Sequence, residues 1–274
     1  MGGQANTNST EGASNFDGSI QAKVKANQDY GFSIVTWNGS GAAATIGHGL
    51  SAAPKLIFVK NRDGAYNWAA GLDAIGWTKY MYLNDTAAAA TSSAVWNDTA
   101  PTSSVFSVKN SSASNRSGDD MVAYCWSEVS GFSDFGSYTG NGSSSGPTIT
   151  TGFKPKFILF KCTTTDNNYT FWTVVDDQRA NVLAWDITDA EGSYNLGTGQ
   201  GISFLDDGFQ VTNVGSNFNI SGETYAYMAF AGTPAGENDD SVFDVPTNGT
   251  QSDTGVGGEV SGNYATYNAL LDNS

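Results

Sequence analysis

The chain has 274 residues, 39% of them hydrophobic and 12% aromatic, which is enough to fill one large core or two ordinary ones. Only 14% are charged, and 27 acidic residues against 12 basic ones give a net charge of −15. A field of that sign repels phosphate backbones and argues against nucleic-acid binding, while the lack of any apolar run near the roughly 20 residues of a membrane-spanning helix argues against membrane insertion. The polar residues are mainly Ser, Thr, Asn and Gly, which are typical of short strands joined by tight turns and favour an all-β fold.

Residues 1–28 open the chain with a polar stretch followed by a short alternating run. They contain neither the basic nor the apolar region of a secretory signal, so we expect no cleaved signal peptide. We interpret them as a flexible leader in which the run SIQAKVKA, at 19–26, is able to form an arm strand.

One short phrase occurs twice in the chain. Residues 54–60 read PKLIFVK and residues 155–161 read PKFILFK, at an offset of 101. Other blocks match in the same order, with gaps only in the polar stretches between them: 32–41 with 135–144, Trp68 with Trp172, 103–110 with 206–213, and 118–126 with 222–230. This order indicates an internal duplication of a domain of about 100 residues.

The matching blocks have the patterns of strands. Residues 56–59 are apolar at every position, so both faces of that strand are apolar, which suits a strand inside a sandwich. Turn signals such as Asn38-Gly39 and Asn141-Gly142 separate the runs at hairpin-like distances. The Ala-rich stretch 85–95 has no amphipathic stripe, so we expect a loop or a single helical turn there.

The predicted fold is therefore all-β, with two tandem antiparallel β-sandwich domains of jelly-roll type related by internal duplication, and with extended terminal arms. The expected boundaries are a leader and arm strand at 1–28, a first sandwich at 29–131, a second sandwich at 132–234, and a C-terminal arm, or the lead-in to a further domain, at 235–274.

The sequence contains few of the residues on which catalysis depends. The only histidine, His48, lies in a Gly-flanked turn, which supports neither a catalytic triad nor a zinc site. No strand carries the alternating carboxylates expected of a glycosidase, so we expect no enzymatic activity and no catalytic residues. Cys125 and Cys162 lack the short spacing of metal ligands; we expect Cys125 to be a buried free thiol, with a disulfide between the two cysteines as the less favoured alternative.

Two kinds of binding site are worth considering. No cofactor is expected, but DNN at 166–168 and GENDD at 236–240 are candidate Ca²⁺ ligands, although neither has EF-hand spacing. Aromatic rings stack on the apolar faces of sugars, and several lie near turns of the first repeat. These candidate glycan contacts are Trp68, Trp77, Tyr80, Tyr82 and Trp96, and the alternative is that they fill a core or an interface.

Several stretches of the chain are together similar to a known module. The stretches GFSIVTWNGSGAAATIGHGLSAAPKLIFVKNRD, TKYMYLN, WNDTAPTSSVFSV and GDDMVAYCWSEVSGFSDFGSYTGNG resemble structural and tail-fibre proteins of marine and aquatic tailed phages. In that family the module is often found beside concanavalin A-like domains of the LamG or SPRY type. The resemblance runs from about Asp17 to Ala235, and it implies a non-enzymatic, virion-associated β-sandwich with a structural or adhesive role.

The ends of the chain leave two interpretations open. Residues 235–274 resemble the lead-in to another jelly-roll domain, and their composition is typical of disordered termini. Alternatively, the runs SIQAKVKA and YATYNALL pair with a neighbouring subunit by strand addition. If every copy donates an arm to the next, the contact does not close and a fibre results.

The main functional hypothesis is a non-enzymatic virion structural protein, a tail-fibre or appendage module that assembles with copies of itself or with other virion proteins. One alternative is a subunit of an extracellular filament held together by exchanged terminal arms. Another is a carbohydrate-binding module for host-surface glycans. All three place the protein in a virion or outside the cell.

Overall fold

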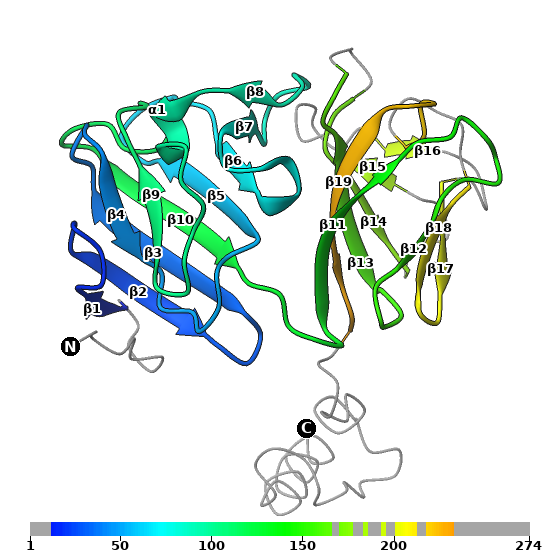
Figure 1. Ribbon diagram of the computed structural model, residues 1–274, viewed down its shortest axis with the longest axis horizontal. Helices are drawn as coiled ribbons and strands as arrows, with labels where there is room; N and C mark the ends of the chain where they lie inside the picture. Colours follow the sequence, from blue (N-terminus) through cyan, green and yellow to red (C-terminus); the bar gives the residue numbers. More distant parts are fainter. Residues whose placement is uncertain are drawn as a thin grey trace, which may run out of the picture. The chain divides into compact units, whose positions relative to one another are not determined.

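The structure is a computed structural model that describes residues 12–165, 170–177, 183–185, 193–195, 201–212 and 218–232. Within these residues the protein is nearly all-β and its sheets are antiparallel, which confirms the all-β part of the predicted fold (Figure 1). Residues up to Ala231 form one compact unit. The predicted C-terminal arm, 235–274, lies outside the described residues.

Helical structure in the described part is limited to the 3₁₀ turn η1 (Asp73–Ile75) and the single turn α1 (Ser93–Trp96). The side chain of Ser92 accepts a hydrogen bond from the Ala94 N–H at 3.2 Å and so caps α1. Asn97, with a φ of 52°, ends the turn in the left-handed region. The expectation of one turn at most in the Ala-rich stretch is confirmed. No helix among the described residues is long and apolar enough to cross a membrane.

The first half of the compact unit, residues 12–131, is built on one large sheet. Its strand order is β1-β2-β3-β10-β5-β6-β7-β8. The bounds are β1 (Ala13–Asn15), β2 (Ala22–Asn27), β3 (Phe32–Asn38), β5 (Leu56–Asn61), β6 (Ala69–Leu72), β7 (Lys79–Tyr82), β8 (Ala90–Thr91) and β10 (Asp120–Trp126). The run predicted as an N-terminal arm strand forms β2, which pairs with β3 of its own chain.

A second, smaller sheet covers one face of the large one. It consists of β4 (Ala44–Gly47) and β9 (Val105–Val108), which lie over the middle strands of the large sheet (Figure 1). Ile46 and Phe106 from the small sheet pack against Val35, Ile57 and Ala123 from the large one, and all five side chains are fully buried. This first core gives the first half its sandwich-like character.

The second half, residues 132–231, has a comparable arrangement. A sheet of order β11-β19-β13-β14 faces a sheet of order β12-β18-β17 across a second core, and β15 and β16 form a separate pair. The bounds are β11 (Ser133–Thr139), β12 (Thr148–Thr150), β13 (Phe157–Cys162), β14 (Thr173–Asp176), β15 (Leu183–Trp185), β16 (Ser193–Asn195), β17 (Ile202–Leu205), β18 (Gly208–Val211) and β19 (Thr224–Phe230).

A third core joins the two halves. Leu56 and Phe58 leave the large sheet on the side opposite the first core and pack with Leu159, Trp172 and Met228 of the second half. The rings of Phe58 and Trp172 meet edge to face, with centroids 5.8 Å apart. This packing explains the repeated phrase: β5 and β13 are apolar on both faces because each lies between its own core and the shared one.

The lysines of the two phrases also have matching contacts. Lys55 and Lys156 follow the prolines, and each ammonium pairs with an aspartate at or just after the end of the next strand: Lys55 with Asp73 at 2.7 Å, and Lys156 with Asp177 at 2.6 Å. Burial tends to raise the pKa of Asp73, but hydrogen bonds from Lys55 and Trp77 outweigh it and hold the pKa below its ordinary value. These pairs fix the start of each phrase against its neighbouring strand.

Cys125 and Cys162 are both free and buried, so the structure supports the free-thiol prediction for Cys125 and not the disulfide. Cys125 belongs to the first core and Cys162 to the second. Burial raises the pKa of the Cys125 thiol well above its ordinary value. The thiol is therefore neutral, and it behaves as a small apolar side chain.

The backbone corrects one block of the sequence alignment. Gly39 N–H donates to Asp119 O, and Gly140 N–H donates to Glu223 O, both at 2.8 Å. Gly41 and Gly142, with φ of 66° and 67°, follow two residues later. The offset in this block is thus 101, and the match of 32–41 with 135–144 was wrong by two residues because it paired two Asn-Gly dipeptides that occupy different positions in their turns.

Candidate functional site

Two of the five candidate glycan-contact residues lie in the first core. Trp96, in α1, is fully buried, and Trp77 is only 6% exposed. Their rings pack edge to face with centroids 5.6 Å apart. A Cβ added to Gly71, on β6, would lie 2.5 Å from Trp77 and 2.7 Å from Trp96, so the backbone there is in direct contact with both rings. Neither tryptophan is accessible to a sugar; both fill the core, as the alternative interpretation stated.

The other three candidates are half-buried and do not form one surface. Tyr80 and Tyr82, on β7, pack against the first core, and their ring centroids lie 5.1 Å apart. Burial, together with the neighbouring Tyr80, raises the pKa of Tyr82. Trp68 lies elsewhere and stacks on Tyr124 of β10, at 6.1 Å. The structure therefore groups four of the five residues around one core and separates Trp68 from them.

Trp68 belongs to a row of neighbouring aromatic rings on the large sheet, in which the Phe32–Trp126 pair is tilted. Tyr124 and Trp126 of this row also pack against the third core. The aromatic row consists of Trp68, Tyr124, Trp126 and Phe32, with successive centroid distances of 6.1, 6.4 and 5.0 Å. All four side chains are half-buried. The alternation in β10 signals that Tyr124 and Trp126 share a face, but neither they nor Phe32 were among the candidate residues. A row of this kind can stack against a flat apolar ligand face.

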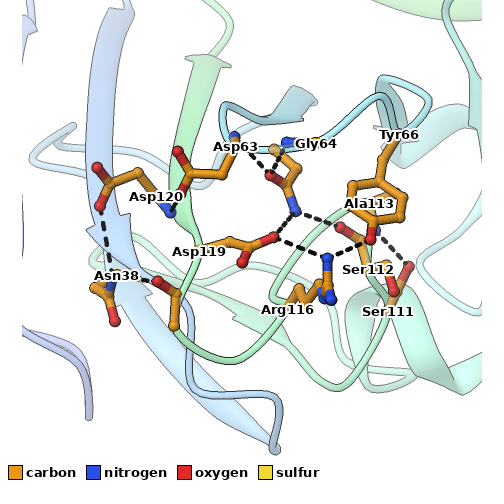
Figure 2. A network of polar contacts seen from close by, with 12 residues as sticks. Asn38, Asp63, Gly64, Tyr66, Ser111, Ser112, Ala113, Arg116, Asp119 and Asp120 are labelled. Carbon is orange, nitrogen blue, oxygen red and sulfur yellow. Dashed lines mark hydrogen bonds and ion pairs between the residues drawn. The ribbon is translucent and has the colours of Figure 1, made fainter.

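A polar network lies at the end of the large sheet where β5 ends and β10 begins (Figure 2). Its centre is the buried side chain of Asn61. The Asn61 Oδ1 accepts the N–H groups of Asp63 and Gly64, at 2.9 and 3.2 Å. Its Nδ2 donates to the Ser112 carbonyl at 3.0 Å and to Asp119 Oδ2 at 2.7 Å. The amide thus binds the turn after β5 to the loop before β10.

Charged side chains extend this network toward the surface (Figure 2). The Arg116 guanidinium lies 3.6 Å from Asp119, donates to the Tyr66 hydroxyl, and sits over the Tyr66 ring at 5.4 Å. The carboxylate of Asp63 accepts the N–H of Asp120 at 2.6 Å. Asp63 is thus bonded by the first residue of β10, and Asp119 by Asn61 at the end of β5 and by Arg116 of its own loop. The arrangement ties the turn after β5 to the start of β10.

In the second half, a different residue makes the contact that Asp63 makes with the Asp120 N–H in the first half. There the Thr164 hydroxyl accepts the Thr224 N–H at 2.9 Å, where Asp63 accepts the Asp120 N–H in the first half. Thr164 also donates to Glu223 at 2.5 Å. Because a neutral threonine does the work of Asp63, the interaction needs a hydrogen-bond acceptor and not a charge. We interpret the network as a structural latch of the fold.

His48 follows β4 and is fully buried. Its Nδ1 accepts the Leu50 N–H and its Nε2 donates to the Thr102 carbonyl, both at 3.1 Å. These two bonds assign the neutral tautomer protonated at Nε2. His48 lies in the irregular segment that follows β4, and its ring links that segment to the one that precedes β9.

The burial of His48 predicts a stability that falls in mild acid. Desolvation is the largest effect and lowers the pKa of His48, although the Thr102 carbonyl and Asp17 oppose it. The unfolded chain, with a histidine pKa of about 6.5, then binds the proton more readily than the folded chain, so stability is lost as the pH falls below about 6.5. Urea unfolding between pH 7.5 and 5 should reveal this slope.

His48→Gln is the control for this prediction. Because His48 is the only histidine, the variant should lose the slope while being less stable at pH 7.5 by about 1 kcal/mol. Burial raises the pKa of Glu128, which gives a contribution of opposite sign in both proteins. A slope that persists unchanged in the variant would show that another group causes it.

The structure groups no three His, Cys, Asp or Glu side chains in a way that fits a metal ion within the residues it describes. The candidate Ca²⁺ runs at 166–168 and 236–240 lie outside those residues, so the Ca²⁺ hypothesis stays a prediction.

One known protein family has a model that matches most of this chain. A family model described as Domain of unknown function (DUF7483) matches residues 5–234. The chain belongs to the DUF7483 family. The matched range contains both halves, the aromatic row and the latch, so the family model covers nearly all of the compact unit. No curated protein and no solved structure matches the chain.

Proposed function

We propose that the protein is a non-enzymatic structural component of a virion, a tail-fibre or appendage module that assembles with copies of itself or with other virion proteins. The observation that carries the proposal is the third core. Two sheets that each already cover a core of their own are fused face to face through Leu56, Phe58, Leu159 and Met228. We expect such a block to be stiff, because close-packed protein interiors resist deformation.

A duplicated β-sandwich is the origin that we propose for this block. The strand order β3-β10-β5-β6 recurs as β11-β19-β13-β14. A buried asparagine holds the same turn in each half: Asn115 Oδ1 accepts the Ser40 N–H at 3.1 Å, and Asn219 Oδ1 accepts the Asn141 N–H at 2.7 Å. Two rigidly joined copies of one domain suit a structural protein that builds an extended fibre.

The resemblance to tail-fibre proteins of aquatic tailed phages supports the same role. So does the use of polar side chains in the described part: the latch and His48 bind backbone groups of their own and of neighbouring loops and hold these loops together. An extracellular filament subunit would have the same properties. A virion component and a filament subunit differ only in the assembly that contains the protein.

Electron microscopy of the purified full-length protein tests the structural role. We expect rods or fibres whose number grows with protein concentration. A protein that remains a monomer at all concentrations, in a virion-free preparation, would contradict self-assembly. Labelling of phage particles with an antibody to the chain then separates a virion component from a cellular filament.

The aromatic row supports a second candidate, a carbohydrate-binding module for host-surface glycans. Of the residues proposed from sequence, Trp68 is the one whose ring is both stacked and half-exposed on the large sheet. A glycan array with the full-length protein tests this alternative, and the absence of binding to any sugar would remove it.

A further inference from the structure

The outer edge of β11 differs from the edge that occupies the same position in the first half. There, β3 lies between β10 and β2 and pairs with both. In the second half, β11 pairs with β19 on one side, and among the described residues no strand pairs with its other side. The second half thus has the counterparts of β3 and β10 but presents no counterpart of β2.

The register shows which backbone groups face this edge. Gly140 N–H donates to Glu223 O at 2.8 Å, and Ala231 N–H donates to Phe132 O at 2.7 Å. Antiparallel pairs alternate, so the even-numbered residues of β11 bond to β19 and the odd-numbered ones point away from it. The N–H and C=O groups of Phe135, Ser137 and Thr139 therefore point toward the outer edge.

In the first half, β2 occupies this position and contributes to the core. Ala22, Val24 and Ala26 are 2%, 0% and 3% exposed and belong to the first core, while Lys23 and Lys25 between them face solvent. A strand with small or medium apolar residues at alternate positions is therefore what this sandwich uses beside its β3 position.

The edge of β11 lacks the usual protection against pairing. Natural edge strands are often blocked by lysine, by proline or by a charge that points inward. The sequence of β11 is SDFGSYT, with no lysine or proline. Its one charge, on Asp134, points to the same side as the core residue Tyr138, but it is already paired there, because it accepts the Tyr227 hydroxyl at 2.6 Å. The edge is thus suited to an added strand.

We propose that the outer edge of β11 accepts the segment YATYNALL, residues 264–271, of a second copy of the chain as an antiparallel strand. This inference rests on the proposed structural function and names its contact. Ala265, Tyr267 and Ala269 fall at alternate positions, as Ala22, Val24 and Ala26 do in β2, with the larger Tyr267 in the place of Val24. Placing Tyr267 where Val24 lies sets it opposite Gly136, the residue that corresponds to Val35 of β3.

The proposed self-assembly favours a second copy over the same chain. β19 ends at Phe230, opposite Ser133, which is the first residue of β11. The linker between β19 and the segment is the same whichever copy accepts the strand, so its length does not decide between them. A segment that paired with its own β11 would block that edge and leave the protein monomeric, whereas a segment given to another copy links subunits.

The proposed contact is heterologous, because the donated segment and the accepting edge are different parts of the chain. Each copy then accepts one strand and donates another, and the series continues without closing unless a ring forms. The geometry points to a fibre in which every second half is completed by the next subunit, in the manner of strand addition.

Two pairs of full-length variants test the two sides of the contact. Ser137→Pro removes one outward-pointing N–H and leaves the bonds to β19, since proline is tolerated where the N–H faces away from the sheet; Ser137→Ala keeps the N–H and is its control. On the donor side, Tyr267→Asp with Ala269→Asp places charges at the inward positions. Thr266→Asp with Asn268→Asp adds the same charge at the outward positions.

Sedimentation velocity of each variant is expected to give monomers for Ser137→Pro and for the inward Asp pair, and wild-type assembly for both controls. Circular dichroism and thermal unfolding confirm that the monomers are folded. Mixing the acceptor-blocked and donor-blocked chains should give a 1:1 complex and nothing longer, because one intact donor and one intact edge remain.

The outcomes separate this inference from the proposed function. If wild type assembles and the inward Asp pair assembles equally well, fibre formation uses another contact and the inference is overturned while the function stands. If Ser137→Pro alone blocks assembly, two β11 edges pair with each other, which also overturns the donor assignment. A wild-type chain that never assembles contradicts both the inference and the function.

Discussion

Replacing Lys161 with alanine is expected to lower the free energy of unfolding by about 3–5 kcal/mol. Lys161 closes the second phrase and its side chain is fully buried. The ammonium donates to the carbonyls of Thr86 at 2.8 Å, of Cys162 at 3.3 Å, and of Thr170. Removing it leaves buried carbonyls short of a donor, at about 1–3 kcal/mol each, and a cavity where the four-carbon stem packed.

The loss should be greatest where the two halves meet. Thr86 belongs to the first half, so the ammonium of Lys161 bonds across the junction. The Ala89 N–H crosses it too, donating to Thr163 O at 2.9 Å, and the Trp172 Nε1 donates to Tyr82 O at 3.0 Å. Hydrogen exchange at Ala89 is expected to accelerate in Lys161→Ala more than exchange at amides within the first core.

Lys60→Ala is the matched control, because Lys60 closes the first phrase as Lys161 closes the second. Its ammonium is half-buried and bonds to the carbonyls of Gly64 and Tyr66 in the adjacent turn, at 3.1 and 2.7 Å. We expect a loss of about 1 kcal/mol. Urea unfolding followed by tryptophan fluorescence compares the two variants, and equal losses would mean that burial and the junction do not distinguish the two lysines.

The repeated phrase shows what an apolar strand pattern in the sequence can predict and what it cannot. Four consecutive apolar residues at 56–59 were enough to predict a strand covered on both faces. They did not identify what covers the second face, because alternation within one strand carries no information on which sheet packs against it. That surface turned out to be the second half, through Leu159 and Met228, and the packing of two sheets depends on residues more than a hundred positions apart.

Two of the aromatic candidates, Trp77 and Trp96, are buried for a related reason. Their nearness to turns suggested access to solvent, yet Trp96 is enclosed between α1 and the large sheet. A turn is a property of the local chain, whereas burial is set by the elements that fold over it. Tyr124 and Trp126 were correctly predicted to share a face, but the stacking of Trp68 on Tyr124 joins positions 56 residues apart and has no local signal.

His48 has one feature that the local sequence predicts and another that depends on long-range strand pairing. Its Gly-flanked position predicted a turn, and the residue lies in the irregular segment after β4, next to Gly49 with a φ of 71°. Its complete burial and its bond to Thr102 depend on the pairing of β4 with β9, which brings together residues 54 positions apart. Local sequence thus indicated where the backbone bends, and long-range strand pairing decided the environment of the side chain.

Trp96→Ala is expected to destabilise the protein by about 3–5 kcal/mol, the range for large aromatic truncations in a core. The indole is fully buried and packs on Trp77 at 5.6 Å and directly over the Gly71 backbone. Trp96→Phe should cost much less, about 1 kcal/mol, because the Trp96 Nε1 has no hydrogen-bond partner within the part of the chain that the structure describes.

Comparing these variants with Trp68→Ala separates a core tryptophan from a half-exposed one. Trp68 stacks on a single ring, so its truncation should cost about 1–2 kcal/mol in thermal or urea unfolding. If Trp96→Phe proved as damaging as Trp96→Ala, the Nε1–H would be making a bond that stabilises the fold. If the losses of unfolding free energy follow the expected order, apolar packing in the first core accounts for most of the loss in Trp96→Ala. The same packing supports the large sheet on the face opposite the shared core.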